Sequence, residues 1–136
     1  AGASDITASI VPGAGNEMAI LSVRMINNDT AARVLSASIN SAAGGVILEE
    51  LINGSTAAAA FRQWPHASSI GDNVTSSTIS PKIVSGTMEL LLTAVAVALS
   101  QDATFAVVAR IKGGVPTVTE AGGGTEVVTI NVEQVF

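Results

Sequence analysis

The sequence contains no cysteine and no tyrosine, and its 136 residues include one histidine and one tryptophan. Aromatic residues make up 3% of the chain and charged residues 12%, about half the charged share of an average soluble domain. Without cysteine there can be no disulfide and no cysteine-ligated zinc, and a single histidine argues against a histidine-based metal site. Catalytic and ligand-binding sites usually carry histidine, aromatic or clustered acidic residues. We therefore expect a building block, with no enzymatic activity, no metal and no cofactor.

The charge balance and the apolar runs exclude two further classes. The formal net charge is −5, from 6 basic and 11 acidic residues, which is the wrong sign for direct nucleic-acid binding. The longest apolar stretch, 90–99, has about half of the roughly 20 residues that cross a membrane, so we expect no membrane contact. Residues 1–5 lack the basic and apolar regions of a signal peptide, which predicts synthesis in the cytoplasm without export.

What the chain does have is a 48% share of hydrophobic residues, arranged in β-branched runs between small polar turns. Strands are predicted at 6–10, 18–26, 33–40, 83–84, 88–97, 103–111 and 126–136. About eight short strands at spacings of about ten residues predict an all-β fold, an antiparallel β-sandwich for which a jelly roll is one topology. The stretch 46–61 fits a strand or a helix, and 57–80 is expected to be a loop with a short strand near 74–79.

The turn signals suggest which strands are neighbours. Asn and Asp at 27–30 form a strong turn, so 18–26 and 33–40 are expected to pair, with Leu21, Val23 and Met25 on one face. In the same way, 88–97 and 103–111 are expected to form a hairpin, with Phe105, Val107 and Ala109 on one face.

The glycine-rich stretch near the end predicts a domain boundary. We expect a β-sandwich domain at 1–120, followed at 121–136 by a linker and a C-terminal strand. That strand pairs either locally or with a neighbouring subunit, because a mobile linker allows strands to be exchanged.

Two segments are candidate interface anchors. The first gathers aromatic and basic residues within six positions, as interface hot spots do; its members are Phe61, Arg62, Trp64 and His66. The alternative for Trp64 is that its ring fills the core. The second anchor is the C-terminal strand, through Val132, Val135 and Phe136.

Two catalytic or ligand-binding interpretations are weaker. His66 lies near Ser68, Ser69 and Asp72, but no Gly-x-Ser-x-Gly motif presents a nucleophile. The segment 12–17 (PGAGNE) lacks the third glycine of a dinucleotide fingerprint and the lysine of a Walker loop, so we interpret it as a turn.

The order of these signals resembles small virion proteins of tailed bacteriophages, namely capsid decoration (cement) proteins and related accessory β-sandwiches. The segments that carry the resemblance are 10–17 (IVPGAGNE), 19–23 (AILSV), 27–30 (NNDT), 83–90 (IVSGTMEL) and 106–110 (AVVAR). The resemblance implies a non-enzymatic protein on the capsid exterior, often a trimer, that binds and stabilises a lattice of major capsid or other shell protein.

Two alternatives stay open. One is a self-assembling surface, sheath or filament subunit, which the same charge-poor composition would suit. The other is a host-attachment or carbohydrate-binding module, which would need an exposed aromatic groove.

Overall fold

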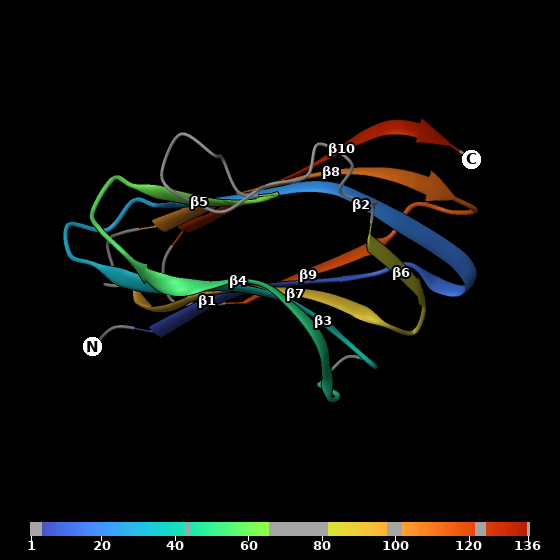
Figure 1. Cartoon of the computed structure of the whole chain (residues 1–136), viewed down its shortest axis with the longest axis horizontal. Coiled ribbons are helices and arrows are strands. Elements are labelled where there is room, and N and C mark those ends of the chain that lie inside the picture. The colour runs from blue at the N-terminus through green and yellow to red at the C-terminus, as the bar shows by residue number, and fades with distance from the viewer. Residues whose placement is uncertain (1–3, 43, 66–81, 98–101, 122–124, 136) are drawn as a thin grey trace.

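The computed structural model describes residues 4–42, 44–65, 82–97, 102–121 and 125–135. In these ranges every regular element is a strand, and the two sheets lie face to face as a β-sandwich (Figure 1). The predicted all-β sandwich is therefore confirmed. These ranges contain no helix with the length and hydropathy that a membrane crossing requires.

Each sheet has five strands. Sheet A has the order β4-β3-β7-β1-β9, with β1 at Ser4–Val11, β3 at Arg33–Asn40, β4 at Ile47–Thr56, β7 at Glu89–Val97 and β9 at Thr117–Ala121. Sheet B has the order β10-β8-β2-β5, with β2 at Gly13–Asn27, β5 at Phe61–Trp64, β8 at Asp102–Lys112 and β10 at Thr125–Val135. The fifth strand of sheet B, β6 at Lys82–Gly86, pairs with β2 beyond the end of β5.

All pairings are antiparallel except one. The C-terminal strand β10 runs parallel to β8 of the same chain, from Thr125 opposite Asp102 to Val135 opposite Ile111. A parallel neighbour needs a crossover, and here the chain reaches β10 from β9 in the opposite sheet. Exchange of this strand between subunits stays a prediction for the assembled protein.

The core forms between the two sheets, from side chains that alternate along each strand. In β8, Phe105, Val107 and Ala109 are fully buried, as their common face predicted. From sheet A, Ile6, Ile10, Leu35 and Leu92 are also fully buried and belong to the same cluster. Because the core holds few aromatic rings, its packing depends on many small and branched aliphatic side chains.

Both predicted strand pairings are wrong. Strands β2 and β3 lie in opposite sheets, and so do β7 and β8. At the first corner, the amide of Asn27 is buried and its Nδ2 donates to the carbonyls of Ala31 and Thr56, each at 2.9 Å. Its Oδ1 accepts from the backbone N of Asp29 at 2.9 Å. These bonds fix a connection that crosses from one sheet to the other instead of returning beside the strand it leaves.

The strand β2 differs from the prediction in the face of Leu21. A register shift between Ile20 and Ser22 marks a bulge, so Ile20 is buried and Leu21 is half-buried, while Val23 and Met25 point into the core as expected. The bulge inverts the alternation for the first half of the strand.

The ambiguous stretch 46–61 is resolved as strand, because it contains β4 and the start of β5. The break expected at 12–16 is short, since β1 ends at Val11 and β2 begins at Gly13. The strand β9 extends to Ala121, so the stretch expected to be linker begins as a strand. The short strand expected at 74–79 lies outside the described residues.

Candidate functional site

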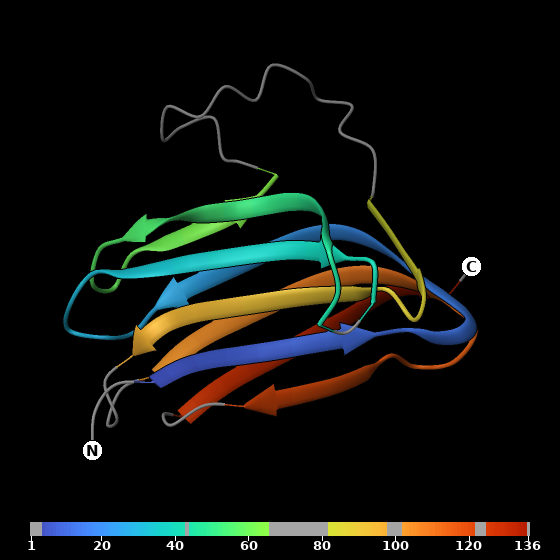
Figure 2. The same cartoon turned by 90° about the horizontal axis from the view of Figure 1, so that it is seen from below.

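The most exposed apolar residues lie at one end of the sandwich. Val46 is 72% exposed, and Ile47 and Leu48 are each 57% exposed, at the start of β4. Val115, in the connection from β8 to β9, is 81% exposed. Both connections lie at the end where β10 finishes, as Figure 2 shows. Large apolar side chains exposed in this way are candidate interaction sites.

The connection between β3 and β4 projects outward from sheet A (Figure 1). Residues 44–50 are all exposed, and we call them the β3–β4 arm; Val46, Ile47 and Leu48 are its apolar triplet. Strand β4 is also the edge of sheet A, so its outer backbone edge has no strand neighbour among the described residues. An apolar edge strand is a natural site for association with another chain.

The arm is held in shape by its own turn. The backbone N of Ser41 donates to the carbonyl of Val46 at 2.8 Å, and the N of Val46 donates to Ser41 Oγ at 3.1 Å. Gly45 fits where a Cβ would come within 2.6 Å of Ser41 Oγ and 2.9 Å of the backbone of Ala42. The turn therefore requires glycine at position 45, and the apolar triplet is presented in a defined conformation.

A buried carboxylate secures the base of the arm. Glu89, 3% exposed, accepts hydrogen bonds from Ser9 Oγ at 2.5 Å, Asn40 Nδ2 at 3.0 Å and the backbone N of Gly44 at 3.3 Å. Asn40 in turn accepts from Ser38 Oγ at 3.0 Å. The network joins β1, β3 and β7 to the arm on the outer side of sheet A. Since a buried carboxylate is costly unless it is fully hydrogen-bonded, these donors stabilise both Glu89 and the arm.

An ion pair links the arm to the opposite sheet. Lys82 Nζ on β6 lies 2.6 Å from Glu49 Oε2, with both side chains partly exposed. Solvent screening reduces the contribution of such a pair to about 1 kcal/mol or less. The neighbouring Glu50 accepts from Asn53 Nδ2 at 3.1 Å on the surface.

The described residues of the first predicted anchor mainly make contacts within the chain. Trp64 is 8% exposed and belongs to the core cluster, so its burial supports the core alternative. Arg62 bridges the two sheets, with Nε 2.9 Å from Thr56 Oγ1 and Nη2 2.8 Å from the carbonyl of Ser55. Phe61 is half-buried, with the guanidinium of Arg24 centred 4.3 Å from its ring centroid. His66 lies outside the described residues.

The second predicted anchor is only partly described. Val132 and Val135 lie on β10, where their backbones pair with Ala109 and Ile111. Phe136 lies outside the described residues. Strand β10 ends at the same end of the sandwich as the arm (Figures 1 and 2).

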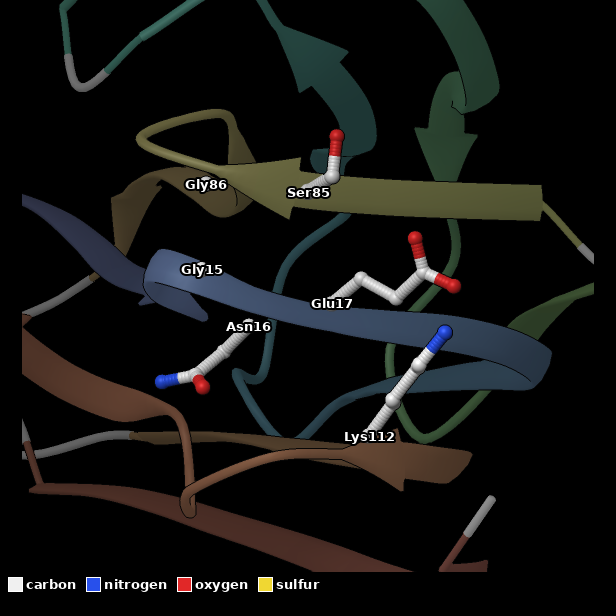
Figure 3. A pocket seen from close by; sticks show the side chains of 6 residues that line it. All are labelled: Gly15, Asn16, Glu17, Ser85, Gly86 and Lys112. Atoms are coloured by element: carbon white, nitrogen blue, oxygen red, sulfur yellow. The ribbon is translucent and has the colours of Figure 1, made fainter.

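A small polar pocket lies on the outer side of sheet B (Figure 3). Its volume is about 250 Å³, and it is lined by Gly15, Asn16, Glu17, Ser85, Gly86 and Lys112. Strand register places Glu17 opposite both Lys112 and Ser85, so adjacent strands bring opposite charges together. The segment 12–17 thus enters a strand, without the helix N-terminus that would hold a phosphate.

The residues considered for catalysis or metal binding are scattered or lie outside the described ranges. The described ranges contain no group of three or more His, Cys, Asp or Glu side chains that could hold a metal ion. The hydroxyl of Ser85 donates to Met88 Sδ at 3.5 Å, and the His66 alternative lies outside these ranges. No protein-family model, no curated protein and no solved structure matches this chain.

The sequence interpretation missed the arm. Its signal was present at 46–50 (VILEE), where three apolar residues precede two acidic ones without alternation. A strand packed on one face of a sheet should alternate, so an unbroken apolar run beside paired acids departs from the pattern of such a strand.

Proposed function

We propose that this chain is a non-enzymatic structural protein that acts by assembling with other protein subunits. The observation that carries the proposal is the β3–β4 arm, an ordered projection whose apolar triplet is more than half exposed. A monomer gains nothing from holding three large apolar side chains in water, whereas an assembled subunit can bury them.

The more specific proposal is that the assembly is a virus particle. The chain would be a capsid decoration protein of a tailed bacteriophage, placed on the capsid exterior and binding the major capsid protein or another shell protein. The resemblance described above supports this, as does a surface with few charges to desolvate. A modest contact repeated over a lattice can stabilise a whole shell.

A sheath or filament subunit is the second candidate. It is favoured by the topology of sheet A, whose two edge strands, β4 and β9, are at opposite sides of the sheet. Two such edges allow end-to-end growth. The carbohydrate-binding alternative finds little support, because Trp64 is buried and the ring of Phe61 is covered by Arg24.

Sedimentation of a native lysate from the source tests the proposal. We expect the chain in DNA-filled particles at a fixed ratio to a major shell protein. Recovery in DNA-free fibres would favour the filament candidate. Recovery only in the light fractions would overturn both.

A further inference from the structure

The basic residues of the chain are distributed unevenly. Three of the six are used inside the sandwich or at its corners, in contacts with oxygen acceptors, namely Arg33, Arg62 and Lys82. The other three are Arg24, Arg110 and Lys112. All three belong to β2 and β8, the two central strands of sheet B.

These three cations point away from the core. Arg24 lies between the buried residues Val23 and Met25, and Arg110 lies between Ala109 and Ile111, which are also buried. Alternation therefore places them on the outer side of sheet B, and Lys112 follows on the same side. We call this surface the basic face; the half-buried Val108 lies between the charges, and the half-buried Ile26 lies beyond Arg24.

The basic face has room for a partner several residues long. Arg110 and Lys112 are two residues apart on one strand, or roughly 7 Å. Arg24 pairs with Ala106, four residues before Arg110, which adds roughly 13 Å along the sheet. Arg110 Nε is buried and has no hydrogen-bond partner in the described part of the chain. Among the side chains that the structure describes on β2 and β8, one acid, Glu17 opposite Lys112, reduces the net charge of this face without cancelling it.

The β3–β4 arm has the complementary character. Its apolar triplet is followed directly by Glu49 and Glu50, both exposed. We propose that the arm of one copy docks on the basic face of a second copy. The inference rests on the assembly role proposed for the arm and names its partner as another copy of this chain.

Charge selects this arrangement over the alternatives. Arm-to-arm pairing would place the glutamates of two copies against one another, which is destabilising. Nucleic acid on the basic face is disfavoured by the net charge of −5. Because the arm and the basic face are different surfaces, the contact is heterologous and leads to a closed ring or an open filament.

Charge exchange tests the contact directly. Sedimentation velocity of the full-length chain is measured over a range of concentrations for the wild type, Glu50→Lys and Arg24→Glu. We expect each substitution to weaken self-association at least about tenfold, because each places like charges together. The variant carrying both substitutions should recover association to within about threefold of the wild type. Glu120→Lys, on β9 outside both surfaces, is the matched control and should associate like the wild type.

Mixing the two single variants gives a second readout. The arm of Glu50→Lys should bind the face of Arg24→Glu, and the arm of Arg24→Glu should bind the face of Glu50→Lys as in the wild type. The mixture should therefore recover the association that neither variant shows alone. Circular dichroism and urea unfolding confirm that each variant is folded. If a variant is unfolded, Lys112→Gln replaces Arg24→Glu and is expected to weaken self-association several-fold.

Three results would overturn the proposal. In the first, the wild type stays monomeric up to about millimolar concentration. In the second, Glu50→Lys weakens self-association but substitutions on the basic face do not. In the third, the double variant associates no more strongly than the single variants. The measurement uses no virus particles. Self-association can therefore be refuted while particle binding is confirmed, and particle binding can be refuted while self-association is confirmed.

Discussion

Replacement of Glu89 tests whether its carboxylate is a buried hydrogen-bond acceptor that stabilises the base of the arm. Glu89→Ala removes the acceptor for three donors, on Ser9, Asn40 and Gly44. Asn40 is 3% exposed, so its amide donor would be left buried without this partner, at a cost of about 1–3 kcal/mol. The hydroxyl of Ser9 and the backbone N of Gly44 can donate hydrogen bonds to water instead, so the loss of each bond to Glu89 costs about 1 kcal/mol.

The sum is a loss of about 3–5 kcal/mol in the free energy of unfolding for Glu89→Ala. For a chain of 136 residues, an unfolding entropy of about 2.1 cal/mol/K per residue converts this to a fall in Tm of roughly 10–18 °C. Glu89→Gln keeps one oxygen in place for Asn40 and Gly44, and its new amide can donate to the oxygen of Ser9. We expect it to cost only about 1 kcal/mol.

Urea unfolding followed by tryptophan fluorescence measures both losses, with exposed Glu120→Ala as the control that should change stability by less than about 0.5 kcal/mol. Amide hydrogen exchange at residues 44–48 reports on the arm, and we expect faster exchange there in Glu89→Ala. Equal and small effects of the alanine and glutamine variants would refute the reasoning, because they would show that the carboxylate is not a buried acceptor.

Three further predictions concern the core, the bridge between the sheets and the arm. Trp64→Ala should lower the free energy of unfolding, measured in urea, by about 3–5 kcal/mol, as loss of a buried ring does. A change below about 1 kcal/mol would show that Trp64 is not part of the core. Gly54→Ala would place a Cβ 2.4 Å from Cζ of Arg62, so the guanidinium should leave its acceptors at a cost of about 1–2 kcal/mol in thermal unfolding; an effect no larger than that of Gly114→Ala would count against the bridge. Replacing the apolar triplet with serine should leave unfolding within about 0.5 kcal/mol of the wild type but reduce self-association measured by sedimentation, and loss of the fold instead would show that the triplet is part of the core.

The all-β sandwich and many core faces could be predicted from the sequence, because alternation has a simple physical cause. A strand that buries one face must place apolar residues at every second position, and Leu35, Ala37 and Ile39 follow this rule and are buried. Where a bulge adds a residue, as at Leu21, the alternation changes phase, and no residue type in that strand indicates where the bulge lies.

The pairing of strands could not be predicted in the same way. A turn such as 27–30 shows where the chain reverses, but it does not show whether the chain returns in the same sheet or crosses to the facing one. The alternation of β3 is the same in both cases, because either sheet presents its apolar face to the common core. The deciding contacts, from Asn27 to Thr56 and Ala57, join residues about thirty positions apart.

The predicted anchor at 61–66 stays a prediction, and the structure shows why its composition is ambiguous. Aromatic and basic residues at 61–66 have the composition of an interface, yet the same types also fill and bridge a small sandwich, as Trp64 and Arg62 do. The exposure of the arm depends on the position of β4 at the edge of sheet A, which only the assembled sheet determines.

The most direct test of the central claim, that the arm is the assembly element, is amide hydrogen exchange compared between the free and the assembled protein. We predict slower exchange at residues 44–50 in the assembly, because their exposed backbone groups become covered. Unchanged exchange at 44–50, with protection confined to other strands, would contradict the claim.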